Sequence, residues 1–365
     1  HLRDIPQDIP FLDEKGKMIF HPEWGLSQHM AYSLDGGQTW TPYTENPILP
    51  AQAHYFDRDP KVFFYAPSNE WFMWLHTSYN NSKRASTLTL FRSSDLKKWE
   101  KIQEISDLWE CPDFFELPLD GDAKNKRWVL VHGTGDYFVG RFDREGFTAQ
   151  ARLQPGREHS RVYASQTFEN APEGRRVQLF WLQATQPDAF PSMPFVHQMT
   201  FPVELTLKTT PEGPRLFTNP VKEIEAYQKP LSDDGAKNFP KGVIVLKESD
   251  GALLDLELSI DVKNSTASEF SVVIGNERLS YNLKTQTLKP FKADEFTLAP
   301  EGDTLHIRIL RDKASLEAFF NHGQKRNLQS VFENPNPLPQ AHIEVSGGTL
   351  TLRQCRLSRL DISAP

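Results

Sequence analysis

Cysteine and long apolar stretches are both scarce in this chain of 365 residues, and each scarcity excludes a class of protein. The two cysteines, Cys111 and Cys355, lie far apart and have no Cys/His spacing typical of zinc, so we expect no disulfide framework, metal or cofactor. No apolar run approaches the roughly 18 residues of a membrane-spanning helix. The first residues do not resemble a signal peptide, so we expect no membrane partner and, if the protein is secreted or periplasmic, a leader already removed.

An excess of basic charge is also missing. The formal net charge is -7, and Lys and Arg form no patch. Nucleic-acid binding draws most of its affinity from such patches, so we expect no nucleic-acid partner. Aromatic residues, in contrast, make up 12% of the chain, which suits both β-structure and stacking against sugars.

Long segments with helical periodicity are absent, and short segments rich in Val, Phe, Trp and Thr recur between turn residues. We therefore predict an all-β protein. The short apolar segments are typical of the inner strands of successive β-propeller blades. The clearest examples are residues 71–76, 87–92, 127–132 and 177–182. The segments Trp40-Thr41-Pro42 and Trp99-Glu100-Lys101 fit two blade ends.

The composition changes after Glu225. Residues 226–240 are polar, with Pro and Gly, and are predicted to be a linker. Beyond it, segments such as 254–262 alternate apolar and polar residues, as half-buried strands do. We therefore predict a β-propeller domain over residues 1–225 and a β-sandwich domain over residues 241–365.

Two motifs place carboxylates where sugar chemistry would need them: Arg58-Asp59-Pro60-Lys61-Val62 and Trp109-Glu110-Cys111-Pro112-Asp113. Companion segments occur around them, in the order Ala31–Trp40, Asn46–Leu49, Tyr137–Gly140, Tyr163–Phe168 and Gln198–Pro202. Together these motifs resemble glycoside hydrolase family 32, the β-fructosidases that include invertases, levanases and exo-inulinases. The resemblance implies a five-bladed-type propeller followed by a β-sandwich. It also implies retaining two-carboxylate hydrolysis of β-fructosides such as sucrose, inulin or levan.

The resemblance assigns roles residue by residue. Glu110 matches the general acid/base, and its setting between Trp109 and Pro112 is expected to raise its pKa. Asp59 matches the transition-state stabiliser, and Arg58 matches the residue that grips a sugar hydroxyl. The remaining expected substrate contacts are Trp109, Cys111, Tyr163 and Trp181. Cys111 is interpreted as a space-filler rather than a nucleophile.

Several positions depart from the family pattern and leave the sugar specificity open. Asp57 stands between Phe56 and Arg58, Arg161 replaces an expected Asp, and Val203 replaces an expected Arg, although Glu204 is retained. Residues 33–40 resemble an Asp-box, a turn in which Asp35 caps backbone amides and Trp40 packs beneath. Because sialidases share that turn, a sialidase remains an alternative, although no three-arginine cluster for a sialic-acid carboxylate is evident.

The family's nucleophile, an Asp in a Trp-Met-Asn-Asp-Pro-Asn-Gly stretch, has no counterpart in the chain. Asp4, Asp8 and Asp13 are present but lack that setting. Two explanations stay open: an N-terminally incomplete β-fructosidase, or a fructan-binding protein that lost hydrolysis. The first blade is then missing or incomplete, with four blades formed, unless a homo-oligomer, another partner or the 11–20 segment completes the ring.

Overall fold

The computed structural model describes residues 26–52, 57–78, 86–153, 162–183, 196–246, 253–331 and 341–361. The chain divides into two compact units, one of residues 1–117 and 126–153 and one of residues 118–125 and 154–365. Nearly all regular structure in both is β-strand, as predicted. Among the described residues, no helix is long and apolar enough to cross a membrane.

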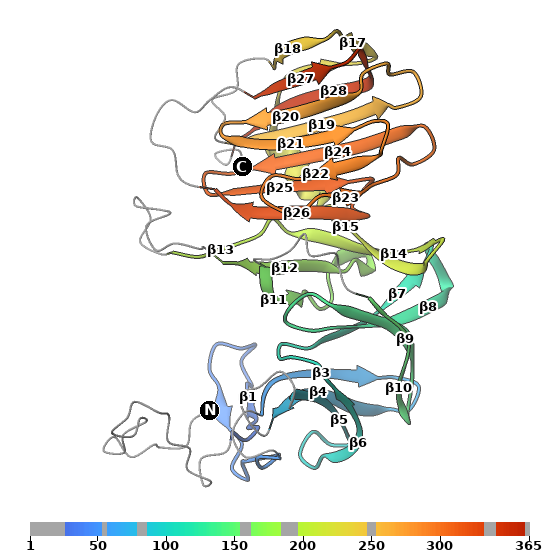
Figure 1. Ribbon diagram of the computed structural model, residues 1–365. Coiled ribbons are helices and arrows are strands. Elements are labelled where there is room, and N and C mark those ends of the chain that lie inside the picture. Colours follow the sequence, from blue (N-terminus) through green and yellow to red (C-terminus); the bar gives the residue numbers. More distant parts are fainter. Residues whose placement is uncertain are drawn as a thin grey trace, which may run out of the picture. The chain divides into compact units, whose positions relative to one another are not determined.

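The first unit is built from antiparallel strands that pair with their sequence neighbours (Figure 1). A two-stranded ribbon of β1 (Ala31–Tyr32) and β2 (Thr41–Pro42) precedes a four-stranded sheet in the order β3–β4–β5–β6. Those four strands are Arg58–Tyr65, Glu70–Ser78, Ser86–Ser93 and Glu100–Ser106. A second meander follows with β7 (Asp113–Leu119), β8 (Asp122–Val131), β9 (Tyr137–Asp143) and β10 (Gly146–Leu153).

Aromatic side chains fill the core of this unit. Phe114 stacks on Trp128 with ring centroids 4.6 Å apart, and Phe63 lies 5.0 Å from Phe114. Phe63 comes from β3, whereas Phe114 and Trp128 come from β7 and β8. The core therefore joins the two meanders through large apolar surfaces, which explains the high aromatic content of the sequence.

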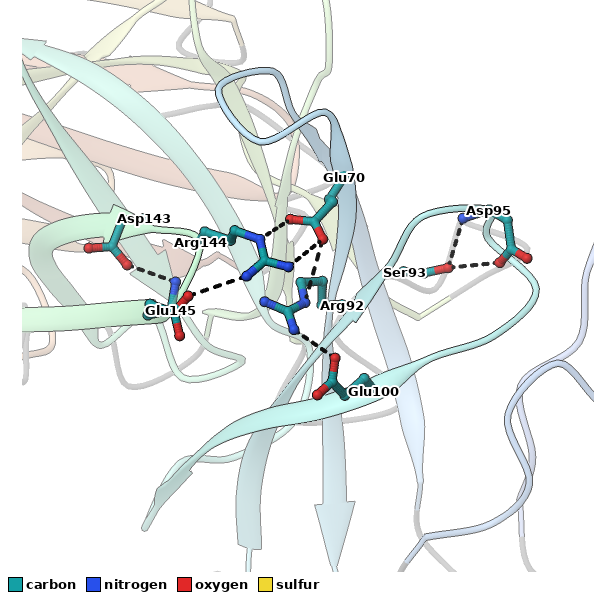
Figure 2. Close-up of polar contacts among 8 residues, drawn as sticks. All are labelled: Glu70, Arg92, Ser93, Asp95, Glu100, Asp143, Arg144 and Glu145. Carbon is teal, nitrogen blue, oxygen red and sulfur yellow. Dashed lines mark hydrogen bonds and ion pairs between the residues drawn. The ribbon is translucent and has the colours of Figure 1, made fainter.

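Charged side chains join the same two meanders at the surface (Figure 2). Arg144, in the β9–β10 turn, donates two hydrogen bonds to Glu70 at the start of β4, at 2.9 and 3.1 Å. Arg92 on β5 lies 3.7 Å from the same carboxylate and pairs with Glu100 at 2.7 Å. A shared carboxylate between two guanidinium groups fixes the turn against the neighbouring sheet.

Two turns of the first unit share one hydrogen-bond pattern. Asp35 Oδ1 accepts the backbone N–H of Thr39 at 2.9 Å, and the Trp40 indole donates to the Gly37 carbonyl at 3.0 Å. Asp95 caps the backbone of the β5–β6 turn in the same way, and the Trp99 indole donates to a carbonyl three residues before it. The predicted capping by Asp35 is confirmed. Trp40 lies against Gly37 of its own turn, as predicted, although it is 64% exposed, whereas Trp99 packs beside Leu49.

The second unit begins with a sheet of β11 (Val162–Thr167), β12 (Val177–Leu182), β13 (Gln198–Met199), β14 (Val203–Thr210) and β15 (Gly213–Pro220). Two short 3-10 helices, η4 (Pro172–Gly174) and η6 (Lys222–Tyr227), flank it. Blade number stays a prediction, because the 1–25 segment, including the 11–20 hairpin expected to complete the ring, lies outside the described residues.

The C-terminal part of the second unit is a sandwich of two antiparallel sheets (Figure 1). One sheet has the order β16–β28–β19–β24–β25–β26, with β17 beside β28. The strands are β16 (Gln228–Asp234), β17 (Lys237–Phe239), β19 (Leu254–Asp261), β24 (Thr304–Arg311), β25 (Ser315–Phe320), β26 (Lys325–Ser330) and β28 (Leu350–Leu360). The other sheet contains β18 (Gly242–Val245), β27 (His342–Ser346), β20 (Glu269–Ile274), β21 (Glu277–Asn282), β22 (Thr287–Lys289) and β23 (Phe296–Thr297).

One apolar cluster lies between these two sheets. It combines Leu256 and Ile309 of the first sheet with Phe270 and Ile343 of the second, all with almost no exposure. The alternating residues that predicted half-buried strands thus supply the sandwich core. Residues 228–239 of the predicted linker form β16 and β17, and the domain boundaries at 225 and 240 stay predictions.

Candidate active site

The first motif lies at a bulge in β3. The pairing of β3 with β4 matches Arg58 with His76 and Lys61 with Trp74, which leaves one extra residue in β3. Asp59, inside the bulge, has φ 59°, a left-handed conformation that is costly for a residue other than Gly. A bulge re-aims the side chains that it contains, so the local backbone sets the direction of the Asp59 carboxylate.

The second motif precedes β7 and contains the same backbone feature. Cys111 has φ 58°, and the Glu110 carbonyl accepts the backbone N–H of Gly133 at 2.7 Å. That hydrogen bond ties the motif to the end of β8, which stops at Val131. The backbone around Glu110 is therefore held by the neighbouring strand rather than by its own segment.

The two motifs face one another in matching register. The Arg58 guanidinium forms an ion pair with the Glu110 carboxylate. Asp59 Oδ2 accepts the backbone N–H of Cys111 at 3.0 Å and the Cys111 thiol at 3.4 Å. Both contacts join residues 52 positions apart, so one motif lies directly beside the other.

A buried ion pair supports this arrangement. Lys61 Nζ lies 3.0 Å from Asp113 Oδ1, and the Asp113 side chain is completely inaccessible. The same carboxylate oxygen accepts the backbone N–H of Phe114 at 2.9 Å. Sequence reasoning assigned no role to Lys61 or Asp113. The sequence does contain a clue: Lys61 and Asp113 carry opposite charges and are separated by the same number of residues as Arg58 and Glu110.

The contact with Arg58 determines the electrostatic surroundings of the Glu110 carboxylate. The Glu110 side chain is 18% exposed and its partner Arg58 is 25% exposed. A nearby guanidinium stabilises the charged form of a carboxylate. The ion pair therefore places a positive charge directly beside the Glu110 carboxylate, and the raised pKa expected from the sequence stays a prediction.

The surroundings of the Cys111 thiol change its acidity. Partial burial, followed by the negative charge of Asp59 and its hydrogen bond, raises the pKa of Cys111 to about 12. A thiol with so high a pKa is protonated at neutral pH and is a poor nucleophile. This supports the interpretation of Cys111 as a space-filling hydrogen-bond donor.

The predicted aromatic contacts fall into two groups. Trp109 lies in the first unit, where its ring meets the buried His76 ring edge-on at 5.5 Å. Tyr163 and Trp181 pair across β11 and β12 in the second unit, with ring centroids 6.3 Å apart. Asp57, the added carboxylate before Arg58, is 2% exposed, whereas Phe56, Arg161, Asp4, Asp8 and Asp13 lie outside the described residues.

The retained Glu204 belongs to a network in the second unit. Arg175 Nε donates to Glu204 at 2.8 Å, and the other guanidinium nitrogens hold Glu223 at 2.6 and 3.0 Å. Val203, where the family pattern has Arg, is fully buried. Within the described part of the chain, one group of His and carboxylate side chains has metal-ligand spacing, and it lies in the sandwich rather than beside Glu110.

A β-propeller-type sheet array, a β-sandwich and paired acidic motifs at strand ends define a glycosidase class of protein. Residues 20–220 match the glycosyl hydrolases family 32 N-terminal domain, and residues 220–359 match the glycosyl hydrolases family 32 C-terminal domain. The chain belongs to glycoside hydrolase family 32. The family matches confirm the predicted family and the predicted all-β propeller-and-sandwich fold. They do not support the sialidase alternative.

Curated relatives include a levanase from Bacillus subtilis (strain 168), which is 30% identical over 347 residues that cover 82% of this chain and 50% of that protein. An extracellular exo-inulinase from Aspergillus niger is 26% identical over 388 residues, which cover 90% of this chain and 70% of that protein. The chain spans about half the length of the levanases that it matches, namely 50% and 40%.

Solved structures share the fold. The exo-inulinase from Aspergillus awamori superposes with a TM-score of 0.76 at 23% identity, covering 94% of this chain and 76% of that one. Fructan 1-exohydrolase IIa from Cichorium intybus gives a TM-score of 0.73 at 16% identity, covering 96% of this chain and 80% of that one.

Proposed function

We propose that this chain belongs to a β-fructosidase that hydrolyses sucrose, inulin or levan with retention of configuration. The observation that carries the proposal is the facing pair of motifs, in which Arg58 meets Glu110 and Asp59 meets Cys111. Names of relatives, which include levanase and exo-inulinase, support the substrate class.

Glu110 is proposed as the general acid/base. It gives its proton to the oxygen of the leaving sugar as the bond from the anomeric carbon breaks, and later removes a proton from the attacking water. Asp59 is proposed to accept hydrogen bonds from ring hydroxyls, which strengthen as positive charge develops on the fructosyl group. The covalent step needs a third carboxylate, because Glu110 and Asp59 both already have roles.

Arg58 is proposed to change partners when substrate binds. In the structure its guanidinium forms an ion pair with the Glu110 carboxylate. If the guanidinium turns to a fructose hydroxyl, Glu110 loses the charge that favours its ionised form and can hold the proton it must donate. Substrate binding and activation of the acid are then one event.

The other residues of the proposed site contact the substrate without taking part in the chemistry. Trp109, Tyr163 and Trp181 offer apolar faces to the sugar, and Cys111 lines the site without reacting. Residues 1–225 are proposed as the propeller and 241–365 as the sandwich, and the strands β16 and β17 of the 226–240 segment add to a sandwich sheet through β28. Export is proposed because relatives are named extracellular, and a second copy or other partner is proposed to complete the propeller.

Fructose release from sucrose, inulin and levan tests the proposal. The 365-residue chain is compared with a version extended at its N-terminus by the family's Trp-Met-Asn-Asp-Pro-Asn-Gly segment. We expect turnover in the extended protein and negligible turnover without the extension, with fructan binding in both. Binding without turnover in both forms would favour the fructan-binding alternative. Absence of both binding and turnover would refute the proposal.

A further inference from the structure

Three side chains from separate segments meet at one edge of the sandwich. His306 lies on β24, His322 lies in the turn between β25 and β26, and Glu301 precedes β24. One ligand atom from each residue lies within 4.8 Å of the others. The two imidazole centroids are 4.1 Å apart, and His322 Nε2 lies 3.8 Å from Glu301 Oε2.

A buried asparagine holds these segments together. Asn321 is completely buried; its backbone N–H donates to the His306 carbonyl at 2.9 Å and its side-chain amide donates to the Ala299 carbonyl at 2.7 Å. Asn321 and His322 both have left-handed φ angles, 45° and 54°. This contact network brings the two histidine backbones and the Glu301 loop together through protein contacts alone, and such preorganisation lowers the ordering cost of binding a ligand.

The second ring nitrogen of His306 is already engaged. Ser259 Oγ on β19 lies 3.2 Å from His306 Nδ1. When Nδ1–H donates to this hydroxyl, the Nε2 lone pair is the one available for coordination.

The donor set selects a class of ion. Two imidazole nitrogens and one carboxylate suit Zn²⁺, Co²⁺, Ni²⁺ or Cu²⁺ rather than Ca²⁺ or Mg²⁺, which take mainly oxygen. Tetrahedral coordination at about 2.0–2.1 Å requires ligand atoms about 3.4 Å apart. The ligand atoms lie up to 4.8 Å apart, and His322 and Glu301 are 53% and 41% exposed, so rotation of these two side chains can shorten the distances.

We propose that Glu301, His306 and His322 bind a divalent transition-metal ion, with Ser259 as a positioning residue for His306. Three protein ligands leave a coordination position for water. The bound ion would link the 299–303 loop, β24 and the β25–β26 turn. The proposal is independent of the fructosidase activity, because none of these residues belongs to the Arg58–Glu110 cluster.

Calorimetric titration of the metal-stripped protein with ZnCl2 tests the proposal. The wild-type protein should bind one more equivalent than either His322→Gln or Glu301→Gln. Ser259→Ala should keep the equivalent but weaken it at least about 10-fold, as is usual when the partner of a metal-bound histidine is lost. MgCl2 should not compete.

His342→Gln is the matched control, because His342 forms a similar His–Glu contact with Glu344 at 3.2 Å but belongs to no three-ligand group among the described residues. It should bind Zn²⁺ like the wild type. Thermal unfolding without metal verifies that each variant is folded, and Zn²⁺ should raise the melting temperature only where the site is intact. Equal stoichiometry and affinity in wild-type, His322→Gln and Glu301→Gln proteins would overturn the proposal.

Discussion

Asp59 and Cys111 are joined by a hydrogen bond between two residues that are both in the left-handed backbone region. The Asp59 carboxylate accepts the Cys111 backbone N–H at 3.0 Å, and φ is 59° at Asp59 and 58° at Cys111. Each unusual conformation costs free energy on its own, so the contact between them is part of what maintains both. The strain lies where the proposed chemistry occurs.

The reactivity of the Cys111 thiol provides a test of its contact with Asp59. At pH 8, iodoacetamide should label Cys111 of the native wild-type protein very slowly, because its pKa is raised to about 12. Asp59→Asn removes the nearby negative charge, lowers the thiol pKa and should speed labelling at every pH below it. Peptide mass spectrometry measures both rates. Buried Cys355, whose pKa is raised to about 11, is the internal reference and should stay unlabelled until the protein unfolds. Equal labelling of Cys111 in both proteins would contradict the predicted coupling.

Glu110→Gln should lower kcat by roughly 10²–10⁴-fold in the extended protein, because the amide cannot donate the proton to the leaving oxygen. The Michaelis constant should change far less, since the lost interaction belongs to the transition state. Asp59→Asn should reduce both turnover and binding. Glu104→Gln, a change at an exposed carboxylate on β6 that pairs with Lys101, is the control and should match the wild type. Similar kinetics for Glu110→Gln and the wild type would remove Glu110 from the mechanism.

Asp255→Ala should destabilise the sandwich by about 3 kcal/mol, the lower end of the range for buried pairs, because it leaves the partly buried Arg308 guanidinium, 19% exposed, without its main partner. Asp255 is 1% exposed and accepts two hydrogen bonds from Arg308, at 3.0 and 2.7 Å, and one from Gln228 at 2.7 Å. Asp255→Asn keeps part of the hydrogen bonding and should cost less. Urea denaturation gives both free energies of unfolding. A change below about 1 kcal/mol for Asp255→Ala, in the range of exposed ion pairs, would show that this pair contributes little.

Gly323→Ala should destabilise the protein by roughly 2–5 kcal/mol, because strain and a clash occur together. Gly323 has φ +84°, and a Cβ there would lie 2.3 Å from the Thr218 carbonyl oxygen. Gly302→Ala is the matched control: φ is +59°, but no atom lies within 4 Å of its Cβ position. It should cost only about 1–2 kcal/mol. Thermal unfolding compares the two, and equal losses would show that the turn moves away from Thr218 without cost.

The sequence predicted the strands better than their arrangement. Residues 71–76 and 87–92 are strands, as their apolar bursts indicate, but they are neighbours in one sheet rather than inner strands of successive blades. An apolar burst reports only that a strand is buried; its partner is decided by turn geometry and packing. For the same reason the sequence did not predict the burial of Asp255. This residue occupies a polar position of the alternating pattern, but in the structure it is buried in an ion pair with Arg308.

The order of motifs along the chain by itself determined the family, the all-β class and the proposal of Glu110 and Asp59 as the catalytic pair. Only the tertiary structure decided that Arg58 holds Glu110, that Lys61 and Asp113 form a buried support, and that Glu301, His306 and His322 meet. The physical reason is the range of the contacts. Turn capping by Asp35 acts over four residues and can be read locally. Pairings across 52 residues depend on how whole sheets pack, and no local pattern encodes that distance.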